Sequence, residues 1–178
     1  MQRLDTRSSD FGAKFDALVN ARREADEDVS ATVRQIISRV RGEGDAALVD
    51  LTQSLDGYDL EAGGWRVSEA DMDAALAGLD PALLAALQLA ADRIRSYHAK
   101  QLPQNRDERD AAGVRLGARW NAVDAAGLYV PGGRAAYPSS VLMNAIPAKV
   151  AGVERIAMVT PTRGGEVNPV VLAAARIA

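Results

Sequence analysis

The residues best placed to do chemistry lie in the run Gly127-Leu-Tyr-Val-Pro-Gly-Gly133. A short apolar segment, residues 125–130, stops there in a Pro-Gly-Gly turn, and a helical pattern follows. Strand, glycine-rich turn and helix N-terminus together form a common site for an anionic or dinucleotide ligand. Gly132 and Gly133 let backbone amides approach a ligand, and Tyr129 offers a ring face and a hydroxyl. The run therefore predicts where a ligand would bind.

The same residues also have a simpler structural interpretation. Pro-Gly-Gly is a frequent tight turn, and Tyr129 also fits the role of a core aromatic residue. The run does not match the Gly-x-Gly-x-x-Gly fingerprint, so the usual dinucleotide argument does not apply to it directly. Spacing alone leaves both interpretations open.

Three polar residues follow the turn and precede the next helix: Arg134, Ser139 and Ser140. They would suit contact with a phosphate or carboxylate at the helix N-terminus. In the simpler interpretation one serine caps the helix and Arg134 is solvated. Asn144, one turn into the helix, has no evident partner.

The composition gives little support for metal or nucleophilic chemistry. The chain has one histidine and no cysteine, which excludes disulfides, thiolate zinc sites and a cysteine nucleophile. His98 has no neighbouring set of Asp, Glu or His and is interpreted as structural. The acidic stretches 24–28 and 107–110 lack the glycine-punctuated spacing of a calcium loop and indicate solvated surface. We assign no catalytic residue and no metal ligand.

Length and charge set the broad class of protein. A chain of 178 residues suffices for one domain, or for a domain and part of another. Its net charge of -3 gives no general reason to bind nucleic acid or an anionic membrane. There is no signal-peptide core, and no apolar run approaches the ~20 residues of a membrane span. We expect a cytoplasmic, soluble protein without nucleic-acid or membrane partners.

Helices are predicted for the first half of the chain. Apolar residues at i, i+3, i+4 and i+7 predict a helix closed by Gly42 and Gly44: Val33, Ile36, Ile37 and Val40. Asp45 can cap a second helix, which Asp56-Gly57 ends.

Two further helices have start signals of their own. Ser68 with Asp71 resembles a capping box. Asp80 followed by Pro81 predicts an N-cap and the first residue of a helix that runs to about Gln101. Residues 104–112 are polar and then small, which is typical of a surface connection.

Strand patterns begin after Gly113. Residues 114–120 alternate between apolar and polar side chains, which predicts a half-buried strand. Residues 125–130 are more uniformly apolar, as in parallel strands buried on both faces. A third strand is predicted over residues 155–160.

A helix between the second and third strands completes the pattern. It begins at Ser139 or Ser140, and Pro147 inside it predicts a kink or local break. Strand, helix and strand in this order predict a parallel βαβ unit with a right-handed crossover. Another helix starts at Pro169 and runs to the end of the chain. So small a parallel sheet has open edges, so we expect the N-terminal piece of a longer protein, poorly folded or associated alone.

Beyond these patterns, the sequence resembles a known family. The run 127–133, followed by residues 138–152, closely resembles the histidinol dehydrogenase family. Further segments that resemble the family follow in the same order along the chain: residues 41–47, Asp56, 95–99, 102–103 and 113–115. The similarity covers essentially the whole chain.

The resemblance implies a fold, a reaction and cofactors. It implies a zinc-requiring, NAD-dependent enzyme of histidine biosynthesis that oxidises L-histidinol to L-histidine through the aldehyde. It also implies an intertwined homodimer with an aldehyde-dehydrogenase-like architecture. Tyr129 matches the tyrosine of the family's Gly-Leu-Tyr-x-Pro-Gly-Gly motif and would contact NAD, with Gly132 and Gly133 as further cofactor-binding residues.

The fold class expected is therefore α/β. An N-terminal helical region leads into an incomplete Rossmann-like parallel βαβ sheet. We divide the chain into an N-terminal arm (1–28), a helical region with the first strand or strands of domain one (29–125), and the truncated start of a Rossmann-like NAD-binding domain (126–178).

The chain departs from the family in one large respect. The family's zinc ligands, its catalytic glutamate–histidine pair and most of its substrate contacts lie beyond residue 178. The chain alone is therefore expected to be inactive. Two alternatives stay open: a family paralogue that oxidises another small alcohol, and a non-catalytic binding or dimerisation module.

Overall fold

The computed structural model describes residues 4–132 and 136–178, without the side chains of residues 21–28. Gly133 and Arg134, both named above, lie outside the described residues. Contacts divide the chain into two compact units, residues 1–52 and 53–178. Each unit is described by itself.

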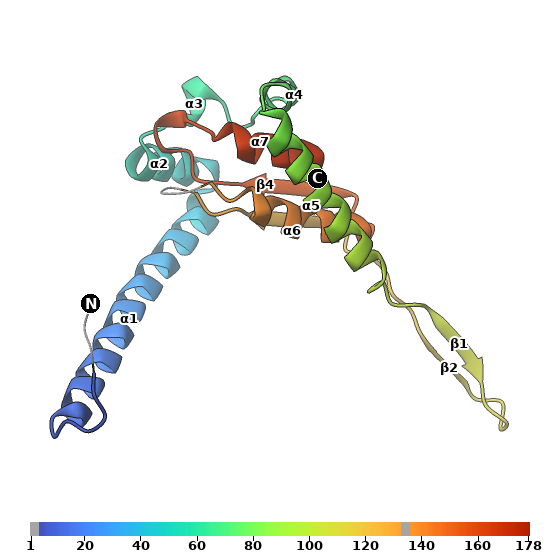
Figure 1. The fold of residues 1–178 in the computed structure, drawn as a ribbon, viewed down its shortest axis with the longest axis horizontal. Helices are drawn as coiled ribbons and strands as arrows, with labels where there is room; N and C mark the ends of the chain where they lie inside the picture. The colour runs from blue at the N-terminus through green and yellow to red at the C-terminus, as the bar shows by residue number, and fades with distance from the viewer. Residues whose placement is uncertain (1–3, 133–135) are drawn as a thin grey trace. The chain divides into compact units, whose positions relative to one another are not determined.

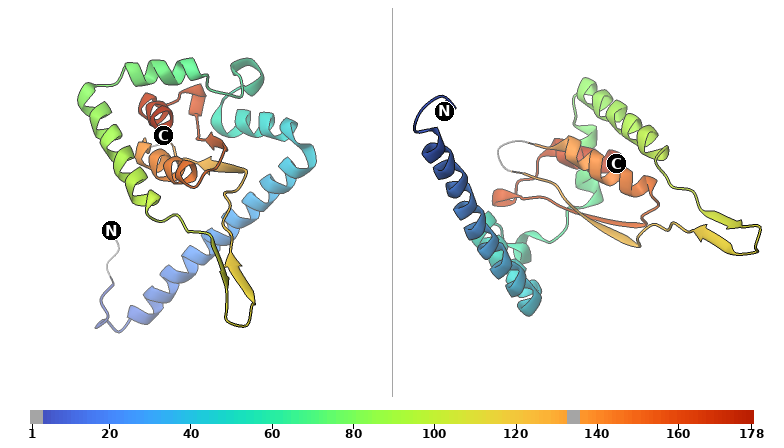
Figure 2. Two further views of the ribbon diagram at one scale, coloured as in Figure 1. Left: turned by 90° about the vertical axis from the view of Figure 1, so that its right-hand side faces the viewer. Right: turned by 90° about the horizontal axis from the view of Figure 1, so that it is seen from below.

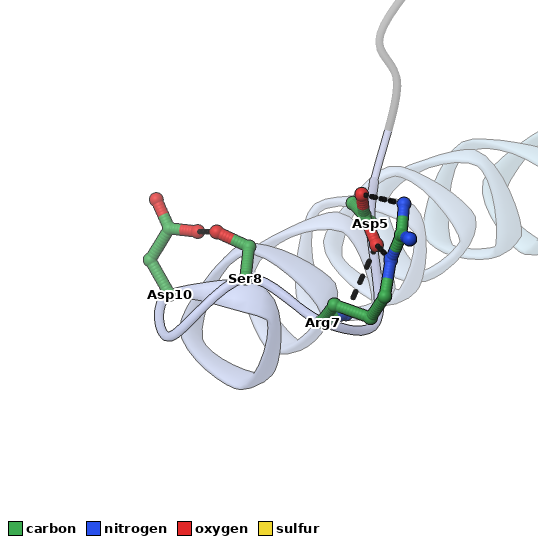
Figure 3. A network of polar contacts seen from close by, with 4 residues as sticks. All are labelled: Asp5, Arg7, Ser8 and Asp10. Carbon is green, nitrogen blue, oxygen red and sulfur yellow. Dashed lines mark hydrogen bonds and ion pairs between the residues drawn. The ribbon is translucent and has the colours of Figure 1, made fainter.

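The first unit consists of helix α1, Phe11–Glu43, and most of helix α2, Asp45–Asp56. Before α1, the Arg7 guanidinium donates to both carboxylate oxygens of Asp5, at 3.1 and 2.9 Å, and the Ser8 hydroxyl donates to Asp10 (Figure 3). The α1 helix ends at Gly44, whose φ is 62° and whose N–H donates to the Val40 carbonyl. The predicted end of this helix at Gly44 is confirmed.

The helix starts much earlier than its apolar stripe suggests. Residues 11–43 contain no proline and are rich in alanine and arginine, which have high helix propensity. Helical propensity therefore extends α1 across residue 28.

The second unit begins with helices α3, Leu60–Gly63, α4, Glu69–Ala77, and α5, Pro81–Ala99 (Figure 1). Ser68 and Asp71 form both bonds of the capping box at the start of α4. Asp80 accepts from the first amides of α5, with Pro81 at the first helical position. Both predicted helix starts are confirmed. In the part of the chain that is described, no single helix qualifies as a membrane span; α4 and α5 pass only when taken together across a 117° bend.

A parallel βαβ unit forms the centre of the second unit. Strand β3, Ala125–Tyr129, leads through helix α6, Pro138–Val150, to strand β4, Arg155–Val159. The two strands are parallel and in register from Ala125 opposite Arg155 to Tyr129 opposite Val159. Helix α7, Pro169–Ile177, follows. The predicted strand–helix–strand order and the α/β class are confirmed.

The two faces of this sheet differ. Leu128 and Met158 face the core, whereas Tyr129 and Val159 on the other face are each 63% exposed. The expectation that residues 125–130 are buried on both faces is therefore wrong for this chain. The reason is that, among the described residues, helices cover only one face of β3 and β4.

The core lies between that covered face and helices α5, α6 and α7. Its largest fully buried side chains come from the residue after β3 and from α6: Val130, Val141, Leu142 and Ile146. The α6 helix continues through Pro147 to Val150, so the predicted local break is wrong. A serine cap is also wrong, because the N-cap residue of α6 is Tyr137, which makes no side-chain cap bond. Packing of this apolar face holds the helix despite the proline and the missing cap.

A β-hairpin extends away from these helices (Figure 2). Strand β1, Arg106–Arg109, pairs antiparallel with β2, Arg115–Ala118. The prediction of a connection over residues 104–112 is wrong, because β1 is a strand without an apolar face. The strand predicted over residues 114–120 is present but exposed: Leu116 is 61% accessible. Backbone pairing and the ion pair of Asp107 with Arg115 hold this hairpin, rather than burial.

Candidate functional site

A cavity of about 220 Å³ lies where β3 and β4 end. It is lined by the segment after β3, by the segment between β4 and α7, and by one residue of α7: Pro131, Gly132, Ala136, Thr160, Pro161, Arg163, Glu166, Val167, Asn168 and Val171. Parallel strands present their carboxyl ends at one edge of a sheet, and ligands of open α/β sheets bind there. The cavity thus stands where such a fold places a ligand.

Gly132 holds the two sides of the cavity close together. A Cβ atom at this residue would lie 3.1 Å from the Pro161 carbonyl oxygen and 3.2 Å from Pro161 Cδ. Contacts this short force a neighbour to move, and here one neighbour is backbone. The missing side chain therefore has a specific use: it lets the segment after β3 pack against the segment after β4.

The segment after β4 is fixed at both of its ends. At its start, the Val130 N–H donates to the Val159 carbonyl at 2.9 Å, which extends the pairing of the two strands. At its far end, the Asn168 side chain accepts from the Val170 N–H at 2.9 Å and caps α7. This bond uses one of the amides that a helix N-terminus leaves without an intrahelical partner.

A tight turn lies between these two ends. The Gly165 N–H donates to the Thr162 carbonyl at 2.9 Å, and Gly164 and Gly165 have φ values of 63° and 81°. Both values are in the left-handed region, which residues other than glycine rarely adopt. The two glycines therefore set the path by which Arg163 and Glu166 reach the cavity.

The charges at the cavity are mixed. Arg163 supplies the basic side chain of the lining and Glu166 the acidic one, and both are exposed. The start of α7 adds the partial positive charge of a helix N-terminus. This combination suits a ligand that carries both anionic groups and hydroxyls or amides.

Tyr129 lies beside the cavity and does not line it. It is the last residue of β3, on the uncovered face of the sheet, and its side chain is 63% exposed. The interpretation of Tyr129 as a core aromatic residue is therefore wrong. Its ring and hydroxyl are accessible at the same sheet edge as Gly132, whereas Gly133 lies outside the described residues.

The other residues considered from the sequence do not line the cavity. Ser139 and Ser140 lie in the first turn of α6, and Asn144 is exposed further along it. His98 is on α5, with its ring edge-on to that of Tyr97 at 5.2 Å between centroids.

The described residues do not fit a zinc site. Among the side chains that the structure describes, those of residues 4–20, 29–132 and 136–178, no group of three His, Asp or Glu residues is arranged to hold a metal ion. A protein zinc site normally takes at least three such ligands or thiolates, and the chain has no cysteine.

Sequence reasoning missed one side of the cavity. Thr160, Arg163, Glu166 and Asn168 were not singled out, although the strand before them and the helix after them were predicted. The signal was available: two parallel strands end at one edge, so the segment after 155–160 had to lie beside the segment after 125–130.

Fold and site together define an α/β protein with a ligand cavity at the carboxyl ends of parallel strands. Sequence comparison identifies the family. The sequence profile of histidinol dehydrogenase matches residues 19–178, and the chain belongs to this family.

Relatives with the same description come from several bacteria. Histidinol dehydrogenase from Agrobacterium fabrum is 57% identical over 175 residues, which are 98% of this chain and 40% of that protein. The one from Zymomonas mobilis is also 57% identical over 175 residues, 98% of this chain and 41% of that protein. The chain thus spans about 40% of the length of these two relatives.

A solved structure agrees with the sequence comparison. The crystal structure of histidinol dehydrogenase from Elizabethkingia anophelis matches with a TM-score of 0.75 and 32% identity. The match covers 84% of this chain and 34% of that one. The fold described above is therefore that of a part of this family's structure.

Proposed function

We propose that this chain is the N-terminal, NAD-binding portion of a histidinol dehydrogenase, with the cavity and Tyr129 forming part of the cofactor site. The observation that carries the proposal is the close packing at Gly132, which brings the ends of two parallel strands around one cavity in a member of this family. The whole protein would oxidise L-histidinol to L-histidine, as a homodimer in the cytoplasm.

NAD held in this cofactor site would supply the hydride acceptor for the two oxidations, from alcohol to aldehyde and from hydrated aldehyde to acid. The role of this chain is to bind and orient the cofactor. The exposed ring of Tyr129 offers a stacking surface and a hydroxyl. Arg163 and the start of α7 favour the anionic pyrophosphate. Glu166 is an acceptor for hydroxyl groups.

The catalytic residues and the zinc ligands belong, on this proposal, to sequence outside this chain. The residues that the structure describes do not form a zinc site. The family resemblance implies that the catalytic glutamate–histidine pair lies beyond residue 178. Residues 1–178 should therefore bind the cofactor without turning over the substrate. Turnover of histidinol by this chain with NAD and zinc, followed as NADH absorbance, would contradict this division of roles.

Calorimetric titration with NAD tests the site. Tyr129→Ala should weaken binding about tenfold, because it removes the exposed aromatic surface. Tyr97→Ala is the matched control: Tyr97 is also 63% exposed, lies on α5, and should leave the affinity unchanged.

If Tyr129→Ala and Tyr97→Ala bind NAD with equal affinity, Tyr129 is not part of the NAD site. A parent chain that binds no NAD and yet forms a dimer in solution would favour the alternative of a non-catalytic dimerisation module. The Agrobacterium fabrum enzyme serves as the positive control for both binding and turnover.

A further inference from the structure

The cavity wall formed by residues 162–166 contacts a tyrosine that is distant in sequence. Tyr58 lies in the connection between α2 and α3, more than 100 residues before that turn. A Cβ atom at Gly165 would lie 2.9 Å from both Cδ2 and Cε2 of the Tyr58 ring. The ring therefore lies directly against the Gly165 backbone.

The ring is also held at a second point. A Cβ atom at Gly63 would overlap the Tyr58 ring, so the ring also packs against the backbone of α3. The Tyr58 hydroxyl donates to the Gly64 carbonyl at 3.1 Å. One side chain thus joins the 63–64 segment to the turn at Gly165, and it needs glycine at both Gly63 and Gly165.

The connection that carries Tyr58 is itself well defined. Gly57 has a φ of 67° and turns the chain after α2. The Asp59 carboxylate accepts from the N–H groups of Glu61 and Ala62 at 2.9 and 3.1 Å and caps α3. Tyr58 is held between these two features, and its side chain is half-buried.

From this arrangement we propose that Tyr58 is a positioning residue for the ligand cavity. It does not line the cavity; it acts through Gly165, whose neighbours Arg163 and Glu166 do. The turn contains two glycines with positive φ, and glycine gives a backbone more freedom than any other residue. Contact with the Tyr58 ring restricts that freedom and keeps both charged side chains at the cavity.

This proposal rests on the proposed function, because the ligand used to test it is NAD. Tyr58→Leu removes the flat ring and should weaken NAD binding about tenfold, since small displacements of binding groups have large effects. Tyr58→Phe keeps the ring and loses only the hydroxyl, and it should bind NAD within about twofold of the parent. Ile94→Ala, on α5 and packed against the core, lowers stability without touching the turn and should leave NAD affinity unchanged.

Hydrogen–deuterium exchange at residues 162–166 tests the role of Tyr58 separately from NAD binding. In Tyr58→Leu the amides of residues 162–166 should exchange faster, and in Tyr58→Phe and Ile94→Ala they should exchange as in the parent. If the parent binds no NAD, the proposed function fails, and exchange alone decides whether Tyr58 holds the turn. The positioning role would be overturned if the amides of residues 162–166 exchange at the same rate in Tyr58→Leu as in the parent. It would also be overturned if NAD affinity simply follows the melting temperature across all three variants.

Discussion

Arg176 on α7 and Asp73 on α4 form an ion pair, with 2.5 Å between Nε and Oδ1, across 103 residues of sequence. Their side chains are 42% and 54% exposed. The pair lies where α4 packs along α7, the helix whose N-terminus closes one side of the cavity. It therefore joins an early helix of the second unit to the last one.

Asp73→Asn should lower the free energy of unfolding only slightly, by about 0.5 kcal/mol, because half-exposed ion pairs contribute little. The difference should shrink further in 1 M salt, where surface charges are screened. Denaturant unfolding measures both effects. Glu154→Gln makes the same change in charge and is the control. If Asp73→Asn lowered the free energy of unfolding by more than about 2 kcal/mol, the ion pair would have to be far less exposed than the structure shows.

Leu142→Ala should destabilise the second unit by about 2–5 kcal/mol, because it leaves a cavity in the core. Leu142 is 1% exposed, whereas its neighbour Met143 is 55% exposed. Met143→Ala is therefore expected to be within about 0.5 kcal/mol of the parent. Thermal unfolding followed by circular dichroism compares the two, and similar melting temperatures would argue against the described orientation of α6.

The hairpin should respond to acid through Asp107. The Arg115 guanidinium donates two hydrogen bonds to this carboxylate, at 2.7 and 2.6 Å, and lowers the pKa of Asp107 below its usual value. A lowered pKa in the folded state means that the pair stabilises the hairpin above the unfolded pKa, about 3.9. That stabilisation is lost as the pH falls through the folded pKa.

Carboxyl chemical shifts measure this titration directly. In Arg115→Gln the pKa of Asp107 should rise toward its ordinary value, while Arg109→Gln, on the same strand as Asp107 but not bonded to it, should leave it unchanged. Identical titration curves in the parent and Arg115→Gln would show that the ion pair does not persist in solution.

Gly132→Ala tests the close approach at the cavity. Its Cβ would lie 3.1 Å from the Pro161 carbonyl oxygen, so the two segments must separate by a few tenths of an ångström. We expect NAD affinity to fall severalfold with little change in melting temperature. Gly127→Ala, which has open space at its Cβ position, is the control; equal affinities would make the contact irrelevant to binding.

The elements of this fold with local signals were predictable from the sequence. The capping box of Ser68 with Asp71 and the Asp80–Pro81 start depend on residues at most three positions apart, and both are confirmed. The parallel βαβ order followed from a change of periodicity between residues 125 and 160. In each case the information lies within one element or its immediate neighbours.

Features that depend on distant contacts were not predictable in the same way. The β1 strand has no apolar face, so no periodicity marks it; only its pairing with β2 makes it a strand. A cap at Ser139 or Ser140 is good local chemistry, but α6 begins earlier because packing of its apolar face outweighs the missing cap. Arg163 and Glu166 reach the cavity through a turn that also contacts Tyr58, which no spacing along the chain reveals.

The packing of α7 on α4 also imposes an order on biosynthesis. Domains fold as they emerge during synthesis, N-terminal parts first. Residues 69–77 leave the ribosome long before residues 169–177, so α4 waits for its partner through the synthesis of α5, the hairpin and the whole βαβ unit. The side of α4 that contacts α7 has no partner during that interval, and the ligand cavity is completed only when α7 is in place.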